Sequence, residues 1–153
     1  DVPLSEKAPY VIRYAGLIDN WAECDCFCSC IKVKKSEEDA LRLLSDRLMK
    51  RKEEFVSRVG IVLMFSKFTD EPTVKKALDI YDALPCGEYY RDMAVAWGLS
   101  VYCVKYPELI TGYLEHSPIS IKVKLMAAQK IRDSRRVSDE HKKRITCIVN
   151  AQR

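Results

Sequence analysis

The sequence predicts an all-α protein built from repeated helix pairs. Apolar residues recur with helical periodicity along nearly the whole chain, and the strict alternation that marks strands is almost absent. Capping residues followed by acidic residues or proline mark several helix starts. A related phrase of one bulky residue, one large residue and several small apolar ones begins at Phe55, Tyr90 and Val123, at offsets of 35 and 33 residues. Each of these phrases is followed by a second helical segment.

The elements follow from these signals in order along the chain. Ser36 before two acidic residues predicts an N-cap, Asp70 before Glu71 and Pro72 predicts a second, and Ser138 before Asp139 a third. Pro107 and Pro118 mark later turns. Between these signals we expect helices near residues 4–15, 20–31, 37–49, 53–67, 72–84, 88–104, 106–115, 119–133 and 139–150.

Helix pairs that recur at this spacing are typical of a HEAT-like α-solenoid, in which each pair buries its apolar face against its neighbours. The pattern alone does not separate HEAT-like stacking from tetratricopeptide-like stacking. At 153 residues the chain fits a single domain, 1–153. A solenoid of a few pairs is curved, and its concave face offers a groove to a long partner.

The net charge of +4 is unevenly distributed. From Pro118 onward there are 10 Lys or Arg residues and 3 acids, whereas the first 117 residues carry 16 basic and 19 acidic groups. A basic block of this kind suits a phosphate-rich partner, although a solvated helix face explains it equally well.

Other site chemistries find little support. Cys24, Cys26, Cys28 and Cys30 alternate between opposite faces of a helix, so they cannot converge on one metal ion, and we expect small buried thiols in a reducing cytoplasm. The two histidines and five glycines form no ligand set or phosphate-binding loop. The longest apolar stretch, 93–104, is too short for a membrane span, and no signal peptide is visible. We therefore expect no metal, no cofactor and no membrane association.

The segment from Trp21 to Asp25 contains two residues that could take part in catalysis. Trp21 and Asp25 lie four residues apart, which places an indole and a carboxylate on one helix face. An aromatic face beside an anion can stabilise a developing positive charge. The alternative is a core anchor whose acid pairs with an arginine on a neighbouring helix, and in isolation this is the more common arrangement.

Together with two later residues, this run resembles the AlkD-like DNA alkylation repair family. Trp21, Asp25, Arg58 and Trp97 occur in that order, in the phrases Asp-Asn-Trp-Ala-Glu-Cys-Asp, Ser-Arg-Val-Gly and Val-Ala-Trp-Gly. The stretch 128–138, Ala-Gln-Lys-Ile-Arg-Asp-Ser-Arg-Arg-Val-Ser, is similar to the family's closing segment. The resemblance covers most of the chain, from about Ile12 to about Lys143. It implies curved HEAT-like repeats that hold duplex DNA, without the family's N-terminal helices, since the chain begins at Asp1.

The resemblance also implies a DNA glycosylase that releases a cationic N3- or N7-alkylated purine by hydrolysing its N-glycosidic bond. Trp21 and Trp97 would face the oxocarbenium-like sugar, Asp25 would stabilise it and orient the attacking water, and Arg58 would hold the DNA backbone and the carboxylate. The predicted DNA contacts are Arg58, Lys122, Lys124, Lys130, Arg132, Arg135 and Arg136.

The alternative is a non-catalytic helical-repeat protein that binds branched or distorted DNA, or a protein partner. In either case we expect a cytoplasmic monomer. For the glycosylase, the expected partner is double-stranded DNA that is alkylated or distorted.

Overall fold

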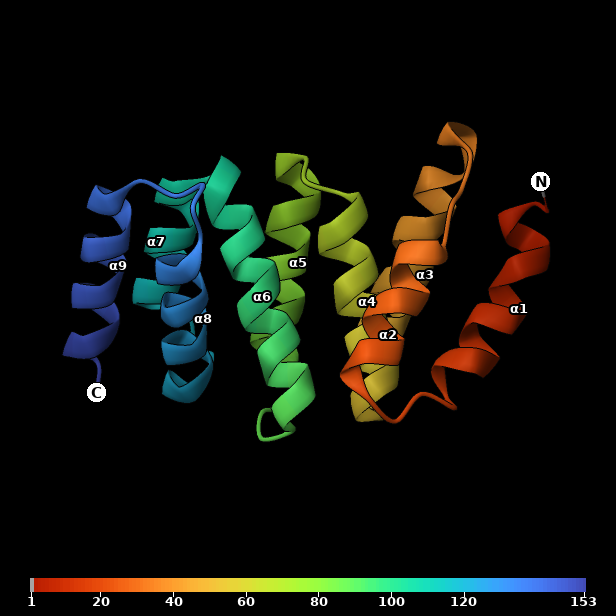
Figure 1. Cartoon of the computed structure of the whole chain (residues 1–153), viewed down its shortest axis with the longest axis horizontal. Helices are drawn as coiled ribbons and strands as arrows, with labels where there is room; N and C mark the ends of the chain where they lie inside the picture. Colours follow the sequence, from red (N-terminus) through yellow and green to blue (C-terminus); the bar gives the residue numbers. More distant parts are fainter. Residues whose placement is uncertain (1) are drawn as a thin grey trace. The chain divides into compact units, whose positions relative to one another are not determined.

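The computed structural model describes residues 2–153, and within this range every regular element is a helix (Figure 1). The prediction of an all-α protein is confirmed. The α-helices are α1 (Leu4–Ala15), α2 (Trp21–Cys30), α3 (Glu38–Met49), α4 (Glu54–Lys67), α5 (Glu71–Ala83), α6 (Tyr89–Lys105), α7 (Pro107–His116), α8 (Ile121–Asp133) and α9 (Asp139–Ala151), and a single 3₁₀ turn, η1 (Lys35–Glu37), precedes α3. Over the same residues no helix is both long and apolar enough to cross a membrane.

Each expected helix is present, and no helix end differs from its expected position by more than two residues. Two of the predicted caps are confirmed, because Asp70 accepts a hydrogen bond from the backbone of Thr73 and Ser138 accepts one from His141. The cap at Ser36 is wrong, because Ser36 lies inside the 3₁₀ turn. The Glu37 carboxylate instead accepts from the backbone N–H groups of Leu4 (2.6 Å) and Lys34 (3.1 Å), and α3 has no side-chain cap.

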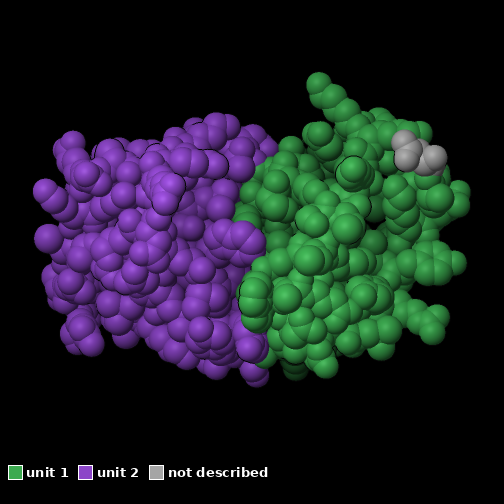
Figure 2. Space-filling view, in the orientation of Figure 1, with its two compact units in different colours: residues 1–68 green, residues 69–153 purple. Residues whose placement is uncertain are grey.

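The chain divides into two compact units, residues 1–68 and 69–153 (Figure 2). In the first unit, α4 packs closely on α3 and also against α2, while α1 contacts α3 and α4. Gly60 allows the closest approach, because a Cβ atom there would lie 2.3 Å from the backbone nitrogen of Met49 and 2.7 Å from the carbonyl oxygen of Ser45. Helix α4 is buried almost all round, which is why its apolar residues show little amphipathic pattern.

In the second unit, α6 packs against α7 and α8, and α9 packs against the same two helices. The hydroxyl of Tyr113 on α7 donates to Asp82 on α5 (2.7 Å), and the hydroxyl of Tyr106 donates to the carbonyl of Thr69 (3.0 Å). Next-but-one helices therefore pack together within each unit, as in the pairs α2 with α4, α6 with α8 and α7 with α9, and some successive helices also do so, as α3 does with α4.

Candidate functional site

Helix α2 positions the first two candidate residues through its N-cap. The side chain of Asn20 accepts a hydrogen bond from the backbone of Glu23 (2.9 Å) and donates to the Glu23 carboxylate (3.2 Å). This reciprocal cap starts the helix at Trp21. The Trp21 indole is 55% exposed, and Asp25 follows one turn later. An open aromatic face therefore lies one turn before a carboxylate.

Asp25 forms an ion pair with Arg58 of α4. The Nη2 atom of Arg58 lies 2.9 Å from one carboxylate oxygen of Asp25 and 3.0 Å from the other, and Nε lies 3.3 Å from the first. The Arg58 side chain is only 4% exposed, whereas that of Asp25 is 22% exposed. The Arg58 guanidinium is therefore buried, whereas part of the Asp25 carboxylate surface is accessible to solvent or a ligand.

Contacts on both sides hold Arg58 in place. On one side the Sγ of Cys28, on α2, donates a weak hydrogen bond to the carbonyl of Val59 (3.7 Å). On the other side the hydroxyl of Ser57 donates to the carbonyl of Met49 at the end of α3 (2.7 Å). With Gly60 against α3, these contacts leave α4 little freedom to slide, so the ion pair has a defined geometry.

Trp97 belongs to the second unit, where it is half-buried on α6. It lines a hollow of about 330 Å³ together with Val101 and Val104 of α6, Lys130 of α8 and Arg136 in the segment that follows. Asp133 and Ser134 also line this hollow. An indole beside two cations can contact both a flat ring and an anion, which are the two parts of a nucleotide.

The other predicted DNA contacts of the second unit differ in how they are held. Arg135 and Arg136 are exposed, and across residues 2–153 neither guanidinium forms an ion pair or a hydrogen bond. Lys122 lies over the ring of Tyr89, 6.0 Å from its centroid, and Arg132 donates to the side chain of Gln129.

Lys124 is oriented differently, because its ammonium donates to the Oε1 of Gln152 (2.7 Å) inside the unit. Burial lowers the pKa of this ammonium, against an opposing effect of the Asp82 carboxylate. In this orientation Lys124 supports the packing of α8 against the C-terminal end of α9. Its predicted DNA contact stays a prediction.

The structure thus brings Asp25 and Arg58 into direct contact and places Trp21 one turn from Asp25. It groups Trp97 with Lys130 and Arg136. The predicted convergence of Trp97 with the other three residues stays a prediction.

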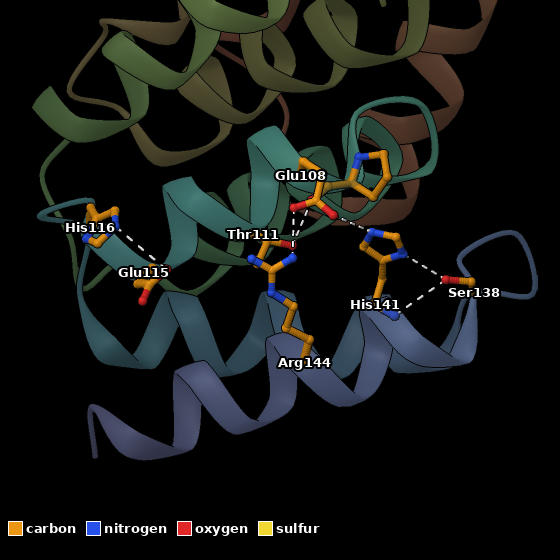
Figure 3. Close-up of polar contacts among 8 residues, drawn as sticks. Glu108, Thr111, Glu115, His116, Ser138, His141 and Arg144 are labelled. Carbon is orange, nitrogen blue, oxygen red and sulfur yellow. Dashed lines mark hydrogen bonds and ion pairs between the residues drawn. The ribbon is translucent and has the colours of Figure 1, made fainter.

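Sequence reasoning missed a polar cluster in the second unit (Figure 3). The Glu108 carboxylate of α7 accepts from Arg144 (2.8 Å) and contacts the Nε2 of His141 (3.0 Å), both on α9. The Nδ1 of His141 contacts the hydroxyl of Ser138 (2.8 Å). These contacts lower the pKa of Glu108, with His141 as the largest cause and Arg144 next. The sequence around Ser138 predicts a helix cap, but it does not predict the contact between His141 and Glu108, because the two residues are 33 positions apart.

The cysteines are only partly as expected. Cys24 and Cys28 are buried and Cys26 and Cys30 are exposed, in agreement with the opposite helix faces. The expectation of buried thiols is wrong for Cys26, Cys30, Cys86 and Cys147, because each is exposed to solvent. Among the residues that the structure describes, no three His, Cys, Asp or Glu side chains are placed to hold a metal ion.

No protein-family model, curated protein or solved structure matches this chain.

Proposed function

We propose that this protein is a DNA glycosylase that excises cationic N3- or N7-alkylated purines from double-stranded DNA. The observation that carries the proposal is the Asp25 and Arg58 ion pair, with its buried guanidinium, partly exposed carboxylate and the open Trp21 indole one turn away. A purely structural ion pair does not require an exposed tryptophan beside it. The order and phrasing of the residues in the sequence add independent support.

The proposal includes the fold, in which successive helix pairs are HEAT-like repeats. Its support is the packing of next-but-one helices within each unit, as of α2 with α4 and of α6 with α8. Trp21 and Asp25 lie on α2, Arg58 on α4, Trp97 on α6 and several of the C-terminal cations on α8, all of them even-numbered helices, while Arg135 and Arg136 lie in the segment after α8. Such a distribution suits a protein whose alternate helices form the binding face.

The chemistry follows from the charges. The bond between C1′ and the purine nitrogen breaks, its electron pair leaves with the base, and the positive charge of the alkylated ring is neutralised in the product. The sugar becomes oxocarbenium-like, and the Asp25 carboxylate stabilises this charge. A water molecule then attacks C1′ and loses a proton to solvent or to Asp25, which leaves an abasic sugar. Because the base departs as a neutral molecule, no strong general acid is needed.

Arg58 has two roles in this scheme. Its contacts to both carboxylate oxygens hold Asp25 in one orientation, so the charge is in place before the bond breaks. Its charge also offsets the cost of keeping a carboxylate partly out of water. Trp21 contributes a π face that attracts a cationic base or sugar.

The test is release of free base from duplex DNA that contains N7-methylguanine. Asp25→Asn keeps the shape of the side chain and removes its charge, so we expect excision to fall by about 10²–10³ while DNA binding changes little. The matched control is Glu23→Gln, another carboxylate-to-amide change two residues earlier on α2. Equal rates for Asp25→Asn and wild type would refute the catalytic role.

A second candidate function is DNA binding without excision. It is favoured by the hollow around Trp97, where Lys130 and Arg136 can contact phosphates and the indole can stack on a base. Tight, salt-sensitive binding to duplex or branched DNA, with no base released by the wild type, would establish this alternative.

A further inference from the structure

The segment between α8 and α9 contains an exposed serine, Ser138, that lies two residues after Arg136 and three after Arg135. Its residues 134–138 read Ser-Arg-Arg-Val-Ser and lie outside any helix. Arg135, Arg136 and Ser138 are exposed, whereas Val137 is buried and anchors the segment. Because neither guanidinium has a partner within residues 2–153, both are available to an incoming acidic surface.

We propose that Ser138 is a phosphorylation site for a basophilic protein kinase and that its phosphate regulates the basic surface of the second unit. Kinases of this class bind arginines two and three residues before the acceptor hydroxyl through carboxylates in their substrate cleft. Arg136 and Arg135 occupy these two positions relative to Ser138. The recognition residues and the acceptor are therefore exposed together on one short segment.

The reaction uses a nucleoside triphosphate with Mg²⁺ as the phosphoryl donor. The Ser138 oxygen forms a new bond to the γ-phosphorus, and the bond from that phosphorus to the β,γ-bridging oxygen breaks. The nucleoside diphosphate leaves, and the hydroxyl proton passes to the catalytic base of the kinase. The product is a phosphoserine that carries a charge of about −1.5 to −2 near neutral pH.

The surroundings of Ser138 show what the phosphate would change (Figure 3). The hydroxyl now contacts the Nδ1 of His141 (2.8 Å) and accepts from the backbone N–H of His141 (3.4 Å). After phosphorylation the ester retains oxygen acceptors but has no hydroxyl proton. The contact with His141 then requires that Nδ1 is the donor, while Nε2 faces Glu108. The polar cluster can thus respond to the modification.

The larger effect is electrostatic, and this part rests on the proposed DNA-binding function. Two negative charges next to Arg135 and Arg136 would compensate two cations that are predicted to contact phosphates. Each phosphate contact contributes about −0.9 to the slope of log K against log salt. Phosphorylation should therefore weaken DNA binding and reduce the magnitude of this slope by about two.

The first experiment tests the modification without DNA. The whole chain is incubated with Mg-ATP and the catalytic subunit of cAMP-dependent protein kinase, and the modified residue is located by mass spectrometry. We expect one phosphoryl group on Ser138 in wild type and none there after Ser138→Ala. The matched control is Ser120→Ala, which likewise removes a serine N-cap, that of α8. No cation directly precedes Ser120, so we expect no modification there, and the variant should keep the phosphoryl group on Ser138.

A second variant separates recognition from folding. Replacing both Arg135 and Arg136 with Gln retains the Ser138 cap, and it should abolish most of the modification. The site would be overturned by an unmodified Ser138 in folded wild type, or by equal modification of wild type and the double variant.

The second experiment compares the phosphorylated and unmodified proteins in salt titrations with duplex DNA. A smaller slope after phosphorylation supports the regulatory role, and equal slopes overturn it. If neither form binds DNA while Ser138 is modified, the proposed DNA-binding function fails and the modification site stands.

Discussion

Arg58 of the first unit and the pair Arg135 and Arg136 of the second unit are held differently. In residues 1–68, Arg58 is buried on α4 and its charge is matched by Asp25, which comes from another helix 33 residues earlier. In residues 69–153, Arg135 and Arg136 are exposed and form no ion pair within the described chain. A buried pair is screened little by salt, whereas exposed cations produce a field that salt weakens strongly. The first arrangement suits a fixed site and the second a salt-sensitive surface.

Gly60 of the first unit and Gly112 of the second unit have different surroundings. Gly60 of the first unit lies against the backbone of α3, where a Cβ atom would come within 2.3 Å of Met49. At Gly112, on α7 of the second unit, a Cβ atom would meet no atom within 4 Å. Glycine is therefore required for helix packing at position 60 but not at position 112.

The largest expected effect is that of Gly60→Ala. The added methyl group would collide with backbone atoms of α3 that cannot move independently, so α3 and α4 must separate. We expect a loss of at least about 3 kcal/mol in the free energy of unfolding, measured by chemical denaturation. A loss below about 1 kcal/mol would show that the two helices adjust easily and that the contrast with Gly112 is small.

The next largest effect is that of Arg58→Met. This change keeps much of the side-chain volume but leaves the partly buried Asp25 carboxylate without its partner. We expect a loss of about 3 kcal/mol in the free energy of unfolding, and the additional change Asp25→Asn should recover part of it. The control is Arg47→Met on α3, which is exposed and should change the stability by no more than about 0.5 kcal/mol. If both variants had the same small effect, the ion pair would not anchor the unit.

A smaller effect of opposite sign is expected for Gly112→Ala. The new methyl group meets open space on a helical residue, and alanine restricts the unfolded chain more than glycine does. We expect a gain of about 0.5–1 kcal/mol in the free energy of unfolding, measured in the same denaturation assay. Destabilisation would mean that the surface around α7 is tighter than its geometry indicates.

The smallest effect concerns Glu108 and pH. His141 and Arg144 lower the pKa of this carboxyl, so its contribution to stability is present above the unfolded-state pKa and is lost as the pH falls through the lower folded-state value. The midpoint of thermal unfolding of Glu108→Gln should thus lie below that of wild type at pH 7, and the gap should narrow on acidification. Glu115→Gln on the same helix is the control. If the difference in unfolding midpoint between wild type and Glu108→Gln stayed constant with pH, the ionised Glu108 carboxylate would be excluded as the cause of that difference.

Much of the local structure could be predicted from the sequence. The helix boundaries depend on apolar periodicity and on caps such as Asp70 and Ser138, which act within a few residues. The error at Ser36 has a tertiary cause, because the Glu37 carboxylate binds the backbone of Leu4 and favours a 3₁₀ turn there. The pairing of Asp25 with an arginine on a neighbouring helix was among the sequence alternatives, and the structure contains it.

The sequence by itself determined that the chain is helical, where each helix lies to within two residues at either end, and which residues could form a charged site. The tertiary structure alone decided that Lys124 turns inward onto Gln152, that Gly60 lies against α3 and that Glu108 meets His141 and Arg144. The physical reason is range. Periodicity and capping act over one or two helical turns, whereas burial and ion pairing depend on residues about 30 positions away that only packing brings into contact.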